Sequence, residues 1–150
     1  MKKVLTNSQE ETIELASKLG NHLKLGSVIL LDGDLGTGKT TFTKGMGKSL
    51  GVRQNISSPS FTIMKSYSFN EDNILNHLDL YRLDGIGADF DLEDYIDDVK
   101  SITIIEWPFK VSSLLPKEYL LIKITYVNEF TREFEFIPVG KTYEDLIDKI

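Results

Sequence analysis

The segment from Gly33 to Thr40 constrains this chain more than any other feature of its sequence. It reads Gly-Asp-Leu-Gly-Thr-Gly-Lys-Thr and matches the pattern G-x-x-x-x-G-K-[ST] at every fixed position. The apolar run 28–31 before it predicts a strand buried on both faces, and residues 39–50 after it predict a helix that ends at Gly51. This order of strand, glycine-rich turn and helix is the setting of a phosphate-binding loop. The segment therefore predicts nucleotide binding on an α/β fold.

The residue types of this loop explain how it would hold phosphate. Glycines let consecutive backbone amides curl around an anion, and the following helix adds the positive end of its dipole. We expect Lys39 to reach the β- and γ-phosphates, Thr40 to offer its hydroxyl to Mg²⁺ and Thr41 to contact the α-phosphate. The predicted nucleotide-binding residues of the loop are Gly33, Asp34, Leu35, Gly36, Thr37, Gly38, Lys39, Thr40 and Thr41.

Composition narrows the class of protein that carries the loop. The chain has 150 residues, 17 Lys+Arg against 23 Asp+Glu, a formal net charge of −6 and no Cys. This length favours a single domain over 1–150, and the absence of cysteine excludes disulfides and thiolate metal sites. No apolar run is long enough to span a membrane and no signal-peptide pattern is present, so we expect a cytoplasmic protein. The acidic balance argues against unaided binding to nucleic acid or to an anionic membrane.

The order of the predicted elements indicates an α/β domain. A helix over about 9–24 is expected to begin with a capping box of Ser8 and Glu11 and to end at Gly26, and Thr142 is expected to cap a last helix. Strands are expected at 61–67, 74–83 and 102–105, a hairpin at 119–127 and 130–137, and a short surface helix within the acidic stretch 85–98. These elements predict a P-loop NTPase-like, three-layer domain with a mixed, largely parallel central sheet.

Two acidic residues near strand ends are candidates for the rest of the site. Asp79 stands in a largely apolar strand, where a carboxylate is costly to bury unless it is paired or faces a metal; the alternative is an ion pair with a Lys or Arg. Glu106 directly follows the run 102–105, where the carboxyl end of a parallel strand meets a ligand crevice; the alternative is a surface acid. We expect Asp79 and Glu106 to be catalytic and, with Thr40, to be the Mg²⁺ ligands.

Several neighbours of these acids have weaker signals. Alternation places His77 on the same strand face as Asp79, where a half-buried histidine is the more common role than a base. Trp107 is expected to be a packing residue, with a platform for base stacking as the alternative. The segment Ser58, Pro59 and Ser60 stands where a nucleotide-sensing switch loop would lie, with an ordinary loop as the alternative.

Four blocks of the sequence, in this order, resemble the TsaE (YjeE) family, the bacterial P-loop ATPases of tRNA threonylcarbamoyladenosine biosynthesis. The blocks are residues 33–41, 58–61, 77–83 and 105–108. The resemblance implies an ATPase that binds ATP and Mg²⁺ and acts with the TsaB–TsaD protein pair, which modifies the tRNA adenosine beside the anticodon. It implies contact with tRNA only through that complex.

The resemblance also implies roles for single residues. Asp79 falls in the Walker B-like block, and Glu106 matches the acidic residue of the metal site. Trp107 is implied to lie beside the site, and Arg132 corresponds to a basic residue that contacts the nucleotide. Ser60 departs from the family, which often has Thr there; serine keeps the hydroxyl and loses the methyl group.

The residues leave two other functions open. A small-molecule or nucleotide kinase shares the loop, but such enzymes supply several arginines to the phosphoryl group, and this chain has only Arg53, Arg82 and Arg132. A non-hydrolysing, nucleotide-dependent assembly factor would use the same loop as an ATPase. The absence of an Asn-Lys-x-Asp segment favours adenine over guanine, and the lack of an evident arginine finger predicts slow turnover by the isolated chain.

Overall fold

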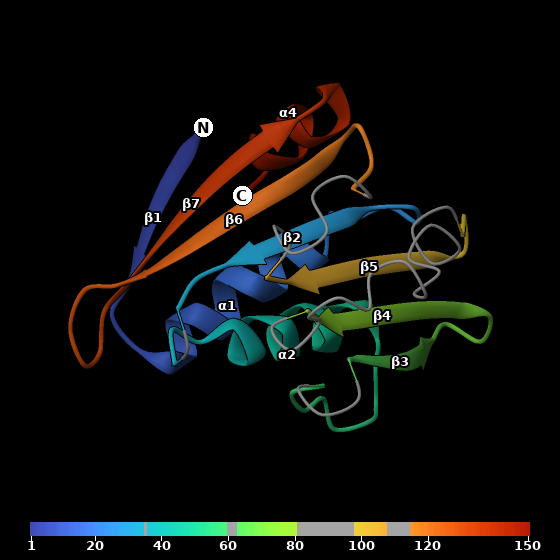
Figure 1. The fold of residues 1–150 in the computed structure, drawn as a ribbon, viewed down its shortest axis with the longest axis horizontal. Coiled ribbons are helices and arrows are strands. Elements are labelled where there is room, and N and C mark those ends of the chain that lie inside the picture. Colours follow the sequence, from blue (N-terminus) through green and yellow to red (C-terminus); the bar gives the residue numbers. More distant parts are fainter. Residues whose placement is uncertain (35, 60–62, 81–97, 108–114) are drawn as a thin grey trace.

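Seven strands and three helices make up the part of the chain that the computed structural model describes, residues 1–34, 36–59, 63–80, 98–107 and 115–150. In chain order (Figure 1) they are β1 (Lys2–Thr6), α1 (Gln9–Gly20), β2 (Val28–Asp32), α2 (Lys39–Leu50), β3 (Met64–Phe69), β4 (Asn73–Asp79), β5 (Ser101–Glu106), β6 (Tyr119–Tyr126), β7 (Arg132–Val139) and α4 (Lys141–Ile147).

The seven strands form one mixed sheet in the order β1-β7-β6-β2-β5-β4-β3 (Figure 1). The neighbours β6–β2, β2–β5 and β5–β4 are parallel, whereas β1–β7, β7–β6 and β4–β3 are antiparallel. The predicted α/β fold with a mixed sheet is confirmed; the sheet is partly parallel, with three parallel pairs at its centre and three antiparallel pairs toward its edges. Because parallel strands end at the same edge, the carboxyl ends of β2, β4 and β5 lie together.

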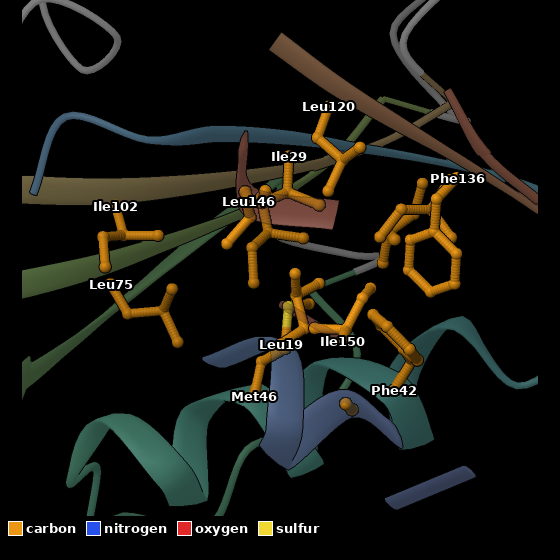
Figure 2. Close-up of a cluster of buried hydrophobic side chains, with 14 of the residues drawn as sticks. Leu19, Ile29, Phe42, Met46, Leu75, Ile102, Leu120, Phe136, Leu146 and Ile150 are labelled. Atoms are coloured by element: carbon orange, nitrogen blue, oxygen red, sulfur yellow. The ribbon is translucent and has the colours of Figure 1, made fainter. Parts of the chain in front are cut away.

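The three helices of the described residues pack against one face of the sheet. Figure 2 shows this core, in which Leu19 of α1 and Phe42 and Met46 of α2 meet strand residues such as Ile29 and Leu75. The opposite face carries a second apolar cluster, made by Val28, Leu30, Leu78, Leu80 and Ile105. The third layer expected over that face stays a prediction, since residues 81–97 and 108–114 lie outside the described part.

Helix α1 begins as the sequence predicts but ends earlier. Ser8 caps it by accepting a hydrogen bond from the amide of Glu11 at 3.1 Å. The predicted end at Gly26 is wrong: α1 ends at Gly20, and the amides of His22 and Leu23 bond to carbonyls three residues back. These bonds tighten the turn after the helix, so the chain leaves it before Gly26.

Other boundaries follow the sequence with some corrections. Helix α2 ends as expected before Gly51, which has the left-handed φ of 104°. Strand β1 was not expected, and the predicted Thr142 cap is wrong, because Gly140 occupies the cap position of α4 without a capping side-chain bond. The helix expected within 85–98 and the end of the strand expected over 74–83 fall on residues outside the described part. In the residues that are described, no helix is long and apolar enough to cross a membrane.

Candidate nucleotide-binding site

The glycine-rich loop joins the carboxyl end of β2 to the amino end of α2. A Cβ atom at Gly33 would lie 2.8 Å from the carbonyl oxygen of Ile124 and 2.8 Å from Oγ1 of Thr37, so the close approach of the backbone requires glycine. Gly38 has a φ of 102° and begins α2 without a side-chain hydrogen bond at the cap. The amides of the first turn of α2 are therefore available to an anion. Leu35 lies outside the described residues.

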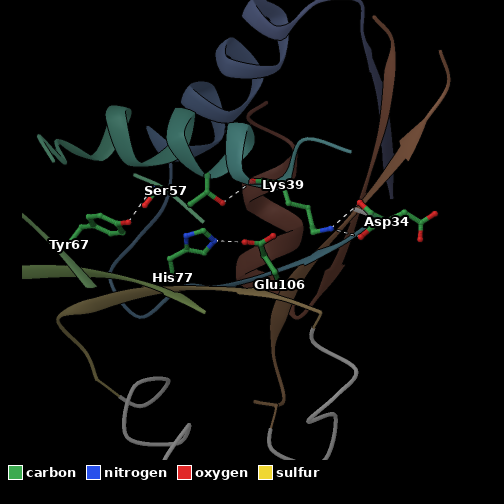
Figure 3. Close-up of polar contacts among 8 residues, drawn as sticks. Asp34, Lys39, Ser57, Tyr67, His77 and Glu106 are labelled. Atoms are coloured by element: carbon green, nitrogen blue, oxygen red, sulfur yellow. Dashed lines mark hydrogen bonds and ion pairs between the residues drawn. The ribbon is translucent and has the colours of Figure 1, made fainter. Parts of the chain in front are cut away.

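Lys39 is buried at the start of α2 and bonds to its own loop (Figure 3). Its Nζ donates to the carbonyl oxygens of Gly33 at 2.5 Å and Asp34 at 3.0 Å. The same ammonium lies 4.4 Å from the centre of the Trp107 ring, a cation–π distance. A phosphate that takes the ammonium must replace these contacts.

The charges around Lys39 act against the effect of its burial. Burial lowers the pKa of Lys39, and the carboxylates of Glu106, Asp79, Asp32 and Asp34 oppose this shift. The carboxylates outnumber the ammonium, so a divalent cation that accompanies a phosphate would balance charge here.

Asp79 and Glu106 stand side by side at the ends of β4 and β5. They are directly opposite each other in the parallel register, and both are buried. Leu75 lies in the core beneath α2, so the alternation of β4 turns His77 and Asp79 toward the same helix face.

The two acids and the loop border one cavity of about 320 Å³, which we call the inner hollow. Residues that line it are Gly36, Gly38, Lys39, Thr40, Thr41, Ser58, Asp79, Glu106 and Trp107. The structure thus brings together the predicted loop, both predicted acids and Trp107.

His77 is buried more deeply than expected. It is fully buried rather than half-buried, and its Nε2 lies 2.5 Å from Oε2 of Glu106 (Figure 3). Glu106 is opposite Asp79 in the parallel register of β4 and β5, and His77 lies two residues before Asp79 on β4. His77 and Glu106 are therefore diagonal neighbours on adjacent strands, which explains their contact.

A second cavity of about 330 Å³, the outer hollow, lies on the other side of the loop. It is lined by Gly36, Thr37, Gly38 and Thr41 of the loop region, by the capping Ser8 with Gln9 and Thr12 of α1, and by Glu129, Phe130 and Arg132 of the β6–β7 hairpin. Sequence reasoning missed the contributions of α1, Glu129 and Phe130. The capping role of Ser8 and the hairpin turn could be predicted from the sequence, but no local pattern predicted that they lie beside the phosphate loop.

Arg132 ties the hairpin to the phosphate loop. Its Nε donates to the carbonyl oxygen of Thr37 at 3.2 Å, and its Nη1 donates to that of Asn128 at 2.6 Å. Its guanidinium carbon lies 4.5 Å from the centre of the Tyr126 ring. Arg132 therefore borders the outer hollow and not the inner one.

The segment with the expected switch residues lies partly in the described region. Ser58 lines the inner hollow, and the carbonyl of buried Pro59 accepts a hydrogen bond from the amide of Ile63 at 2.8 Å. Ser57, just before, accepts a bond from Nζ of Lys65 on β3 at 2.6 Å. Ser60 lies outside the described residues.

Comparison with known proteins identifies the family. A family model described as threonylcarbamoyl adenosine biosynthesis protein TsaE matches residues 6–134. The chain belongs to the TsaE family. The resemblance inferred from four sequence blocks is thus confirmed, and the TsaE match includes the loop, both acids and Arg132.

Two TsaE proteins of known sequence and one solved structure match nearly the whole chain. The tRNA threonylcarbamoyladenosine biosynthesis protein TsaE of Bacillus subtilis (strain 168) is 37% identical over 147 residues, which cover 97% of this chain and 90% of that protein. The TsaE of Nostoc sp. (strain PCC 7120) is 41% identical over 156 residues, which cover 98% of this chain and 92% of that protein. The crystal structure of Bacillus subtilis YdiB superimposes with a TM-score of 0.84 at 35% identity, covering 99% of this chain and 92% of that one.

Proposed function

We propose that this chain is a Mg²⁺-dependent ATPase subunit that acts with a TsaB–TsaD type protein pair in tRNA threonylcarbamoyladenosine biosynthesis. Membership of the TsaE family supports the pathway. The inner hollow supports the ATPase activity, because it joins Lys39 and Thr40 of the loop to Asp79 and Glu106 of the adjacent strand ends. The proposal includes a cytoplasmic location. It also includes a contact with tRNA made only through the complex, because a net charge of −6 disfavours direct binding of this chain to the tRNA phosphates.

The oxygen atoms that line the inner hollow suit Mg²⁺. Thr40, Asp79 and Glu106 offer a hydroxyl and two carboxylates, the hard donors that this ion prefers. In the part of the chain described, no group of three or more His, Cys, Asp or Glu side chains could hold a metal ion alone. That fits an ion held jointly by protein, water and phosphate. Bound Mg²⁺ supplies neutralisation of the charge on the transferred phosphoryl group.

The residues of the chain would act by positioning and by charge. The amides of the loop and Lys39 hold the β- and γ-phosphates, which fixes the γ-phosphorus relative to the ends of β4 and β5. Glu106, at the end of β5, lines the same hollow and accepts a hydrogen bond from an attacking water. The Trp107 ring lines the hollow beside Lys39 and holds the ammonium at its face.

The outer hollow is the proposed binding site of the nucleoside. It adjoins the loop on the side of Thr37 and Thr41, and its volume of about 330 Å³ lies within the range of small-molecule sites. Phe130 is 68% exposed on the hairpin that borders it, and Arg132 lies on the same border. An aromatic ring and a guanidinium are the groups on which a base stacks.

The placement of the arginines favours a slow ATPase over a kinase. Within the described residues, no arginine lines the inner hollow: Arg132 borders the outer hollow, and Arg53 borders a separate cavity beside α2. Arg82 lies outside the described part. Phosphoryl transfer without an arginine at the γ-phosphate is slow, so partner subunits are expected to stimulate turnover.

The replacement of Glu106 by glutamine tests the proposed function. Phosphate release from Mg-ATP in the presence of a purified TsaB–TsaD pair should fall about 100-fold or more in Glu106→Gln, because a neutral amide is a weaker acceptor for the attacking water and a weaker ligand for Mg²⁺. Complex formation, followed by gel filtration, should be unchanged. Glu14→Gln, an exposed position on α1, is the matched control and should keep the parental rate.

Three results would lead to other conclusions. A parental rate in Glu106→Gln would show that the assignment of this acid is wrong. Complex formation that needs ATP but proceeds without phosphate release in the parent chain would favour the assembly factor. Rapid transfer of the phosphoryl group to a small acceptor would favour a kinase.

A further inference from the structure

The buried pair of His77 and Glu106 contains a group to which the proposed function assigns no role. The imidazole of His77 is 0% exposed, and its Nε2 lies 2.5 Å from Oε2 of Glu106, which is 3% exposed. At that distance from a carboxylate oxygen, Nε2 carries a hydrogen and donates it. One oxygen of Glu106 is therefore engaged on the side away from solvent.

The other ring nitrogen makes this arrangement unusual. Nδ1 of His77 is buried and has no hydrogen-bond partner in the described part of the chain. A buried nitrogen without a partner lowers stability, whereas an apolar side chain of similar size at this core position would not. The polar contact that the ring does make is the one to Glu106.

We propose that His77 is a positioning residue that fixes the carboxylate of Glu106 for its work in the inner hollow. The hydrogen bond to Oε2 prevents rotation of the carboxylate and leaves Oε1 for the water or the cation that the hollow receives. Partners that orient a ligating carboxylate in this way set metal affinity and rate without touching the substrate. The inference rests on the proposed function, because it assigns His77 a role through Glu106.

A purely structural role for His77 is the alternative, in which the bond only joins β4 to β5. The two strands already pair along the backbone from Ile74 opposite Ser101 to Asp79 opposite Glu106. A merely structural bond would affect unfolding and leave turnover of the folded protein unchanged.

Three substitutions separate these roles. In His77→Gln the side-chain amide can take the place of Nε2 and still donate to Glu106. In His77→Asn the amide takes the place of Nδ1 and falls short, and His77→Leu keeps bulk without a donor. His22→Gln, at an exposed position, is the control for loss of a histidine.

We expect His77→Asn and His77→Leu to lower kcat with the TsaB–TsaD pair about tenfold or more, and to weaken Mn²⁺ binding to the ADP complex by a similar factor. Mn²⁺ binding is measured by electron paramagnetic resonance and needs no turnover. The KM for ATP at saturating Mg²⁺ should change less than about twofold, since Lys39 and the loop are untouched. His77→Gln should restore most of both losses.

The results that overturn the inference are distinct from those that overturn the function. Equal losses in the Gln and Asn variants, or parental kcat and Mn²⁺ affinity in the Asn variant, would show that His77 does not position Glu106. If His77→Leu does not fold, the comparison of Gln with Asn decides. If the parent chain hydrolyses no ATP, the proposed function fails, and the Mn²⁺ affinities alone still decide the role of His77.

Discussion

Gly45 lies where α2 crosses α1, and its replacement by alanine tests how closely these helices must pack beneath the phosphate loop. A Cβ atom at this position would lie 2.7 Å from Cβ of Ala16, 2.8 Å from the carbonyl oxygen of Ile13 and 3.2 Å from Cα of Ile13. The carbonyl belongs to the backbone of α1 and cannot rotate away. Alanine at 45 can therefore fit only if the two helices move apart.

Two opposing effects set the size of the change. Replacing glycine by alanine inside a helix stabilises it by about 1 kcal/mol, whereas overpacking a core contact costs about 1–3 kcal/mol. Because the carbonyl oxygen of Ile13 beside Gly45 is a backbone atom, the cost of overpacking lies near the upper end of its range, at about 3 kcal/mol. The expected loss for Gly45→Ala is then about 2 kcal/mol, or about 4–8 °C in Tm for a chain of this size.

Gly47→Ala is the matched control in the same helix. It has the same gain in helix propensity, but its Cβ would overlap Cδ1 of Ile56, the far end of a flexible side chain. We expect Gly47→Ala to unfold in urea within about 0.5 kcal/mol of the parent, since the Ile56 side chain can move at small cost. A Gly45→Ala variant as stable as Gly47→Ala would refute the account of the helix crossing.

Three further predictions concern single contacts. The pKa of Lys39 is lowered by burial, so the ATP affinity measured by calorimetry should be full below that pKa and should fall as the pH rises through it. The fall should begin at a lower pH than the ordinary pKa of lysine would give. Lys39→Arg, which stays protonated, should show no such fall. Tyr143→Phe removes the oxygen that accepts from the buried amide of Val28 at 2.9 Å, and the free energy of urea unfolding should drop by about 1–3 kcal/mol. Arg132→Lys loses the fork that bonds to Thr37 and Asn128, and the KM for ATP should rise about fivefold or more with little change in kcat.

Each of these predictions has a result that would contradict it. An ATP affinity that falls only in the usual pH range of lysine would show that burial does not lower the pKa of Lys39. A Tyr143→Phe chain as stable as the parent would mean that water satisfies the Val28 amide. An unchanged KM in Arg132→Lys would place the nucleoside away from the outer hollow.

The phosphate loop could be predicted because its chemistry is local. The turn from Gly33 to Gly38, the start of α2 at Lys39 and its end before Gly51 depend on residues a few positions apart. Asp79 and Glu106 could be paired because both stand at the carboxyl ends of apolar strands, and parallel strands end at one edge of a sheet.

What could not be predicted depends on contacts between distant segments. Strand β1 is a short edge strand in which most side chains are partly or fully exposed, so its alternation of polar and apolar residues is too weak to predict a strand. Its pairing with β7, a segment far away in the sequence, stabilises it. The outer hollow needs Ser8, the cap of α1, and Phe130 of the hairpin on the same side of the loop, and the sheet order decides that. The bond from His77 to Glu106 likewise depends on the register of β4 and β5, which neither strand specifies alone.

The rate of phosphate release from Mg-ATP, measured for the purified chain alone and with the TsaB–TsaD pair, tests the central claim most directly. We expect slow release by the chain alone, because no arginine in the described residues lines the inner hollow, and a rise of about tenfold or more with the pair. Release that the pair does not stimulate, at any ATP concentration, would contradict the proposal that this chain is an ATPase subunit.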